Sequence, residues 1–185
     1  MVPEERPLLA PEPGDRAMRF QLRPAVLFGL VSGVALSVAC SGAPGEKPYD
    51  RVPDAARAIL EKADQLELLS LNPKNEPEDK RGKDTFHNYK ILGQTTVKGD
   101  DRKALLAALL DGVKNSGSGS AACFNPRHGI RAVHDGKTTD LVICFECTNI
   151  VVYVGDKREQ EVHTTRTPQK TFDKILTDAK VPLAP

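Results

Sequence analysis

Hydrophobic residues recur every three or four positions in three stretches of the chain, which is the spacing of one face of an α-helix. The first stretch begins near Pro53 and ends near Ser70, the second begins near Asp101, and the third begins at Thr167-Pro168. Proline is favoured in the first helical turn, which supports the first and third helices. The predicted buried faces are Ala56, Ile59, Leu60, Ala63 and Leu66; Leu106, Leu109, Leu110 and Val113; and Phe172, Ile175, Leu176 and Ala179.

Segments rich in β-branched and aromatic residues predict strands over residues 88–97, 130–134, 139–154 and 160–166. The dipeptide Asp135-Gly136 separates the second and third segments and favours a type I′ hairpin turn. A two-residue turn places Arg131 opposite Asp140 as a cross-strand ion pair. The third segment is apolar on both faces, so we expect one long strand at the centre of the sheet.

The predicted elements follow the order α-β-α-β-β-β-α, with short hairpins and no repeated βαβ unit. This order predicts an α+β domain in which a mainly antiparallel sheet of about four strands packs with three helices. The charged segment 72–84 and the Gly/Ser segment 116–120 are predicted loops. We therefore expect residues 51–185 to form a single domain.

The segment that precedes this domain has the three parts of an export signal. Arg19 and Arg23 supply a basic start, residues 25–39 are apolar, and small residues precede Cys40. Residues 37–40, Ser-Val-Ala-Cys, resemble the lipobox of bacterial lipoproteins, in which the cysteine is acylated and becomes the first residue. Ser37 stands where that motif usually has leucine. Ordinary cleaved secretion and an uncleaved membrane anchor are the alternatives, although the apolar run is short for a membrane span.

The signal begins at the internal Met18, so we predict that residues 1–17 are a mis-annotated or disordered extension and that residues 18–39 are the signal peptide. Residues 40–50 are rich in Gly, Pro and polar residues, which predicts a flexible tether between lipid and domain. Ser41 follows the acylated cysteine, and a serine at this position resembles the pattern of lipoproteins that are sorted to the outer membrane. The expected location is the cell envelope, at the periplasmic face of the outer membrane.

The charge of the chain restricts its partners. Lys and Arg number 26 against 25 Asp and Glu, a formal net charge of +1. Nucleic-acid binding depends on many contacts between basic side chains and phosphates, so we expect no nucleic-acid partner. We expect the protein to contact the membrane through its N-terminal lipid anchor. The sequence does not indicate a particular protein or small-molecule partner.

Three cysteines remain once Cys40 is assigned to lipid, and an exported protein is expected to hold one disulfide and one buried thiol. Extending the hairpin register back from the Asp-Gly turn places Cys123 one residue out of line with Cys147. The same register places Cys123 four residues, about 13 Å, from facing Cys144. Because a disulfide needs α-carbons within about 7 Å, the sequence favours a Cys123–Cys147 bond.

A metal site is the alternative for the same residues. Cys123, His128, Cys144 and Cys147 supply thiolate and imidazole ligands that zinc or copper prefers. Residues three apart in a continuous strand point to opposite faces, which argues against Cys144 and Cys147 gripping one ion. Thiol redox chemistry at this Cys-x2-Cys pair is a third hypothesis, weakened because strand sequence, and no helix, follows the pair.

The second half of the chain resembles a family of uncharacterised bacterial proteins, many of them exported. The resemblance rests on the motifs Cys-Phe-Asn-Pro-Arg-His-Gly-Ile-Arg (123–131) and Asp-Leu-Val-Ile-Cys-Phe-Glu-Cys (140–147), with the helix before them and the closing Thr-Pro-x-x-x-Phe-Asp helix. It implies export and no known activity.

No carboxylate pair, phosphate-binding loop or hydrolase triad is evident in the sequence. We therefore expect a membrane-tethered, non-enzymatic structural or binding domain braced by a disulfide, with no cofactor. A zinc- or copper-binding lipoprotein and a thiol redox enzyme remain the alternatives.

Overall fold

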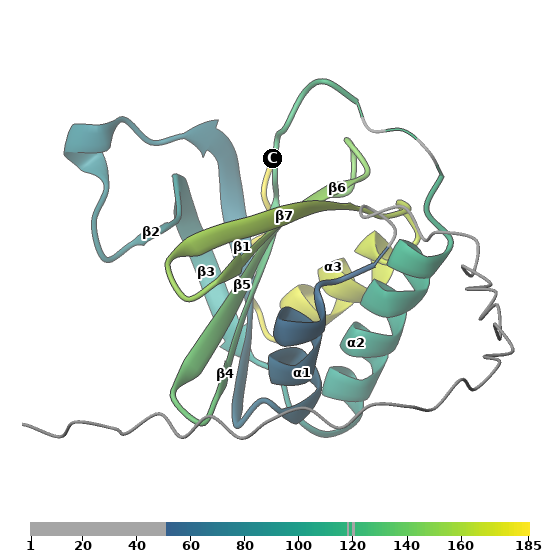
Figure 1. Cartoon of the computed structure of the whole chain (residues 1–185). Helices are drawn as coiled ribbons and strands as arrows, with labels where there is room; N and C mark the ends of the chain where they lie inside the picture. Colours follow the sequence, from purple (N-terminus) through teal and green to yellow (C-terminus); the bar gives the residue numbers. More distant parts are fainter. Residues whose placement is uncertain (1–50, 118, 120) are drawn as a thin grey trace, which may run out of the picture. The chain divides into compact units, whose positions relative to one another are not determined.

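Seven antiparallel strands and three α-helices form the part of the chain described by the computed structural model, residues 51–117, 119 and 121–185 (Figure 1). This architecture confirms the α+β class. The predicted extension, signal peptide and tether, with Cys40, lie outside the described residues. No helix among the residues described is long and apolar enough to cross a membrane.

The sheet has the strand order β2-β3-β1-β4-β5-β6-β7, and every neighbouring pair is antiparallel. The prediction of about four strands was wrong. In chain order the elements are α1 (Asp54–Lys62), β1 (Gln65–Asn75), a short 3-10 helix (Glu78–Lys80), β2 (Thr85–Phe86), β3 (Tyr89–Thr96), α2 (Gly99–Lys114), β4 (His128–His134), β5 (Lys137–Cys144), β6 (Asn149–Val154), β7 (Lys157–His163) and α3 (Gln169–Asp178).

Strand β1 occupies residues that the hydrophobic spacing had assigned to the end of the first helix. Helix α1 ends at Lys62, and Ala63 has extended backbone angles. The guanidinium of Arg102 in α2 donates hydrogen bonds to the carbonyls of Ala63, Glu61 and Leu60, which the end of α1 leaves without helical partners. The chain can therefore leave the helix early, and the leucines that follow are buried in β1.

The apolar run 139–154 forms two strands and not the single long strand predicted. Residues 145–148 make a tight turn between β5 and β6, in which Thr148 has a positive φ of 53°. The amide of Thr148 donates to the carbonyl of Phe145. Because residues on both sides of the turn are buried, hydropathy gives no sign of it.

The three helices cover one face of the sheet (Figure 1). The first core cluster lies between helices and sheet and includes Leu60 of α1, Leu109 of α2 and Phe172 of α3, all fully buried. Gly112 allows α2 to approach the start of α3, because a Cβ there would meet Pro168 and lie 2.8 Å from Oγ1 of Thr164. Of the predicted helix faces, Leu106 and Leu110 are only partly buried and Ala179 is exposed.

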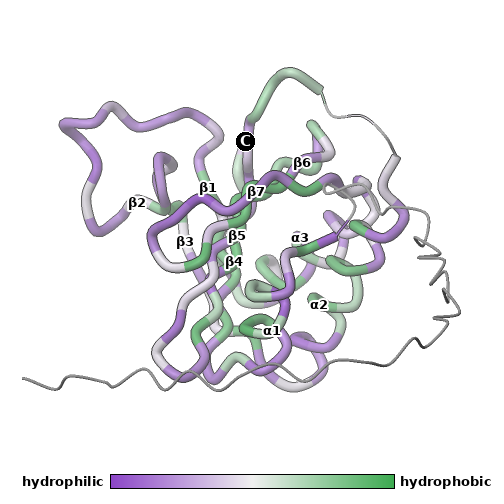
Figure 2. Tube along the Cα trace, viewed as in Figure 1, coloured by the Kyte–Doolittle hydropathy of each residue, from purple (hydrophilic) through white to green (hydrophobic). Residues whose placement is uncertain are grey.

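The opposite face of the sheet carries a smaller cluster of Leu69, Leu71, Phe86, Tyr89, Val142 and Val151. Figure 2 shows that hydrophobic residues follow the central strands, whereas the segment between β1 and β2 is hydrophilic. The two edges of the sheet are short or charged: β2 has two residues, and β7 has the sequence Lys-Arg-Glu-Gln-Glu-Val-His. The pairing of β7 with β6 also shifts register between Val152 and Tyr153.

The predicted hairpin is confirmed. Asp135 and Gly136 have φ angles of 48° and 71°, the positive values that a type I′ turn requires. Arg131 pairs with Asp140 across β4 and β5, as the sequence predicted. His87 also contacts the Asp140 carboxylate, with its Nε2 3.1 Å from Oδ2, and its ring stacks on Tyr153 at 3.7 Å.

Candidate functional site

The two motifs that carry the family resemblance line one polar pocket where β4 begins and β5 ends. Its volume is about 360 Å³. The first motif contributes Asn125, Arg127 and His128, the second contributes Phe145 and Glu146, and the approach to α3 contributes Arg166 and Gln169. Segments about 20 residues apart in sequence therefore meet here because β4 and β5 pair as a hairpin and α3 packs beside them.

His128 forms the wall of the pocket and is almost fully buried, with 3% of its surface exposed. Its Nε2 lies 2.8 Å from Oδ1 of Asp173 in α3, and its ring contacts Phe145 and Phe172 at centroid distances of 5.2 and 5.7 Å. The hydrogen bond from His128 lowers the pKa of Asp173 below its ordinary value, against a smaller opposing effect of burial. Aromatic packing and this bond fix the orientation of the imidazole.

Arg127 and Arg166 supply the positive charge of the pocket. Arg127 donates through Nη1 to Oε2 of Glu146 at 2.8 Å and through Nε to the backbone oxygen of Pro185 at 2.7 Å. Arg166 donates through Nη2 to the backbone carbonyl of Glu146 at 2.9 Å. The hydrogen bond from Arg127 lowers the pKa of Glu146, so this carboxylate remains ionised and neutralises one guanidinium.

Two arginine side chains make the lining of the pocket rich in hydrogen-bond donors. A guanidinium has five N–H donors, and one donor of Arg166 is used by another described residue. The side-chain amides of Asn125 and Gln169 add donors and acceptors to the lining, and Nε2 of Gln169 donates to Oδ2 of Asp173 at 3.4 Å. With two cationic side chains against one carboxylate in the lining, the pocket suits a small molecule that carries a carboxylate or phosphate.

The three cysteines lie beside this pocket, at the turn between β5 and β6. The structure bonds Cys144 to Cys147, in place of the predicted Cys123–Cys147 bond. The Sγ atom of Cys123 lies 3.6 Å from Sγ of Cys147, and its thiol is free and exposed. The prediction assumed that the regular pairing of the hairpin strands continues as far as Cys147. The turn at residues 145–148 instead brings Cys147 back beside Cys144, with their α-carbons 5.3 Å apart.

The predicted metal ligands do not gather as four free donors in this state. The sulfurs of Cys144 and Cys147 are bonded to each other, and Nε2 of His128 is directed at Asp173, so these three atoms are not free to bind a metal. The turn does remove the objection that these two cysteines must point to opposite faces. Among the residues described, the group of His, Cys, Asp and Glu side chains close enough to share an ion is Asp64, His134 and Asp135.

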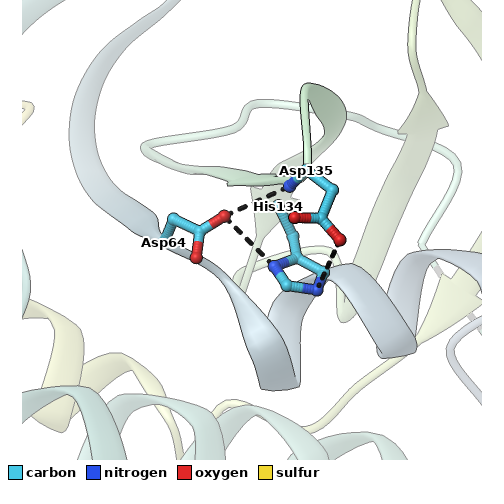
Figure 3. Close-up of side chains that lie close together, drawn as sticks. All are labelled: Asp64, His134 and Asp135. Carbon is cyan, nitrogen blue, oxygen red and sulfur yellow. Dashed lines mark hydrogen bonds and ion pairs between the residues drawn. The ribbon is translucent and has the colours of Figure 1, made fainter.

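That exposed group joins two turns (Figure 3). Oδ2 of Asp64 accepts hydrogen bonds from the backbone amide of Asp135 and from Nδ1 of His134, both at 3.1 Å. The bond from Asp135, followed by that from His134, lowers the pKa of Asp64. These contacts tie the α1–β1 link to the β4–β5 hairpin, which is a sufficient structural role for the group.

Of the residues that line the pocket, the sequence predictions named only His128 as a candidate site residue. Asp173 is the final residue of the Thr-Pro-x-x-x-Phe-Asp motif, and Gln169 lies within it. Their membership of that motif was the one signal that could have pointed to them. Nothing local in the sequence indicates that Asp173 meets His128, which is 45 residues away.

Comparison with known proteins leaves the family unassigned. No family model and no curated protein matches the chain. Among solved structures, the chain is similar to "Putative Lipoprotein from Clostridium perfringens", with 12% sequence identity and a TM-score of 0.41, over 69% of this chain and 99% of that chain. A likeness of this size supports no conclusion about shared fold or function.

Proposed function

We propose that this chain is an exported lipoprotein of the cell envelope, anchored through acylated Cys40, whose α+β domain binds a small carboxylate- or phosphate-bearing ligand in the pocket of Arg127, His128 and Arg166. The observation that carries the binding role is the convergence of two guanidinium groups and two side-chain amides on one pocket. The anchor rests on the signal and lipobox-like sequence of residues 18–40.

The chemistry of the pocket favours binding over catalysis. The imidazole of His128 packs against Phe172 and is directed at Asp173. The carboxylate of Glu146 is hydrogen-bonded to Arg127. Arg166 uses one of its five N–H donors in its hydrogen bond to Glu146 within the described part of the chain, and guanidinium groups bind carboxylates and phosphates through paired hydrogen bonds. The buried imidazole supplies a fixed wall, which reduces the entropic cost of ordering the site around a ligand.

A titration of the isotopically labelled full chain in detergent micelles tests the pocket. We expect inorganic phosphate or acetate, at ionic strength matched with chloride, to shift the amide resonances of Arg127, His128 and Arg166 in a saturable manner. Arg166→Gln should weaken this binding by about tenfold or more, since a hydrogen bond to a charged group contributes about 1.5–3 kcal/mol.

The matched control is Arg81→Gln, because Arg81 is exposed and its guanidinium donates to the nearby carbonyl of Glu76, away from the pocket. It removes the same charge away from the pocket and should leave the affinity unchanged. Shifts that do not saturate, or that are equally weakened in both variants, would show general charge screening and refute the binding role.

Labelling cells with an alkyne analogue of palmitate tests the anchor. We expect the wild-type chain to take up the label and to sediment with envelope membranes, and Cys40→Ser to do neither. Release of an unlabelled mature chain would identify ordinary cleaved secretion. Membrane association without label, on an uncleaved chain, would identify a transmembrane anchor. Separation of inner and outer membranes then tests the predicted outer-membrane location.

Metal binding is the second candidate, because the fold brings the three sulfurs together beside His128's strand. It requires reduction of the Cys144–Cys147 bond and reorientation of His128 away from Asp173. Native mass spectrometry of the reduced full chain with added zinc should then show one bound ion, lost in Cys123→Ser. Absence of a stoichiometric ion in the reduced chain would exclude this candidate.

A further inference from the structure

We propose that Cys123, Cys144 and Cys147 form a thiol–disulfide exchange centre, in which Cys123 replaces Cys144 as the partner of Cys147. This inference concerns the sulfur cluster and is independent of the ligand proposed for the pocket. Thiol–disulfide exchange requires a thiolate that can reach a disulfide sulfur, and it is faster when the departing thiolate is stabilised. The cluster has both.

The attacking and accepting sulfurs are already adjacent. Sγ of Cys123 lies 3.6 Å from Sγ of Cys147, close to van der Waals contact, while Sγ of Cys147 is bonded to Cys144. Cys123 is exposed, whereas Cys144 and Cys147 have 0% of their surface exposed. Solvent therefore reaches the cluster at Cys123, which makes this residue the point of contact with external thiols or disulfides.

Backbone contacts hold the segment before Cys123 against the turn between β5 and β6. The amide of Ala121 donates to the carbonyl of Cys147 at 3.2 Å. Oγ1 of Thr148 lies 2.8 Å from the carbonyl oxygen of Cys147 and 3.4 Å from that of Gly119, so its one proton is shared between them. These bonds do not involve the sulfurs, so they can persist in either pairing. The proximity of Cys123 to Cys147 is therefore built into the path of the chain.

The amide of Cys147 is placed to stabilise the leaving group. It donates a hydrogen bond to Sγ of Cys144 at 3.1 Å. A hydrogen bond to the charged form of an ionisable group favours that form, so negative charge that develops on Cys144 during exchange meets a donor already in position. This contact offsets part of the cost of forming a thiolate in a buried site.

The exchange step is balanced within the chain. The thiol of Cys123 loses its proton to solvent, and the thiolate attacks Sγ of Cys147. A Cys123–Cys147 bond forms while the Cys144–Cys147 bond breaks, and the electron pair of the broken bond leaves on Cys144, which takes a proton from solvent. One disulfide and one thiol are present before and after, so no oxidant or reductant is consumed.

The two pairings differ in what they connect. The bond between Cys144 and Cys147 spans a sequence separation of 3 within one turn. The bond between Cys123 and Cys147 spans 24 and ties the segment after α2 to that turn. Asn125 and Arg127, two and four residues after Cys123, line the polar pocket. Exchange therefore links the thiol state of the cluster to the segment that forms one wall of the pocket.

Time-resolved alkylation of the full chain tests the proposal. The chain is purified without added thiol and incubated at about pH 8, near the ordinary pKa of a cysteine thiol. Samples are then quenched with N-ethylmaleimide. Cleavage by trypsin and glutamyl endopeptidase, which cut after Arg127 and Glu146, places the three cysteines on separate peptides.

We expect the label to divide between Cys123 and Cys144, with both the Cys144–Cys147 and the Cys123–Cys147 linked peptides present. Restriction of the label to Cys123 at every time, with a single linked peptide, would overturn the proposal.

Two matched variants test whether Cys147 is the partner that Cys123 and Cys144 share. Cys144→Ser should form the Cys123–Cys147 bond on treatment with glutathione disulfide, seen as an intact mass two hydrogens lower. Cys147→Ser should not form an internal bond, because it removes the sulfur to which both others are joined or adjacent. Circular dichroism verifies the fold of each variant, and the wild-type alkylation pattern decides the question if either variant does not fold. Two free thiols in folded, oxidised Cys144→Ser would refute exchange.

Discussion

The guanidinium of Arg131 binds the carboxylate of Asp140 through two parallel hydrogen bonds, from Nε to Oδ1 at 2.9 Å and from Nη2 to Oδ2 at 2.7 Å. The carboxylate side chain is only 4% exposed, whereas that of Arg131 is 43% exposed. His87 adds a third contact to the same carboxylate. The buried carboxylate of Asp140 is thus bonded by Arg131 from across the hairpin and by His87 from the β2–β3 turn.

Asp140→Asn should lower the free energy of unfolding by about 1–3 kcal/mol, because a bidentate charged pair becomes a neutral one while the shape is kept. Urea unfolding of both chains measures the difference. The control is Arg57→Gln, which breaks an exposed ion pair with Glu61 on α1 and should leave the free energy of unfolding almost unchanged, because solvent screens such pairs. Equal effects of the two substitutions would contradict the assigned role of Asp140.

The contribution of Asp140 should depend on pH. Burial raises the pKa of this carboxyl, but the hydrogen bonds from Arg131 and His87 lower it by more, so its pKa in the folded chain lies below the ordinary value. Stability from such a group is complete above the pKa of the unfolded chain, about 3.9, and is lost as the pH falls through the folded pKa. The difference between wild type and Asp140→Asn should therefore shrink below about pH 4. An equal difference at pH 7 and about pH 3 would contradict this assignment.

Gly112→Ala should destabilise the domain. Alanine normally favours a helix over glycine by about 1 kcal/mol, but here its Cβ would overlap the ring of Pro168 and crowd Thr164. Overpacking costs about 1–3 kcal/mol, so after the helix gain of about 1 kcal/mol we expect a net loss of up to about 2 kcal/mol in thermal or urea unfolding. Gly117→Ala is the matched control, since its Cβ would have nothing within 4 Å. A gain in stability from Gly112→Ala would show that the helices separate freely at this point.

Asp173→Ala should destabilise the chain by about 1–3 kcal/mol, because it leaves Nε2 of buried His128 without its partner. The double variant His128→Phe with Asp173→Ala should cost less than the sum of the two single changes, since it removes both partners of one interaction. Unfolding free energies of the four chains form the double-mutant cycle. Simple additivity would mean that the contact contributes nothing.

Local sequence signals were sufficient where one turn determines the geometry. Asp135-Gly136 sets the register of β4 and β5, and that register in turn places Arg131 against Asp140. The stripe of Phe172, Ile175 and Leu176 likewise identified the buried face of α3. Each of these features depends on residues fewer than ten positions apart.

The remaining features depend on contacts that the local pattern does not encode. The leucines after Ala63 fit a helix as well as a strand, and the carbonyls bonded by Arg102, about 40 residues later, mark where α1 ends. The turn at 145–148 lies inside an apolar run, so its effect on cysteine pairing was invisible. The contact between Asp173 and His128 depends on how α3 packs against the sheet.

The short β2 and the charged, irregular β7 leave both rims of the sheet poorly suited to strand addition. If lipid tethering concentrates many copies on one membrane surface, unpaired strand edges would otherwise invite neighbouring copies to join into a continuous sheet. Lysine, arginine and glutamate along β7 place charge where a second strand would have to dock. The domain can therefore be crowded on a membrane and still remain a separate folded unit.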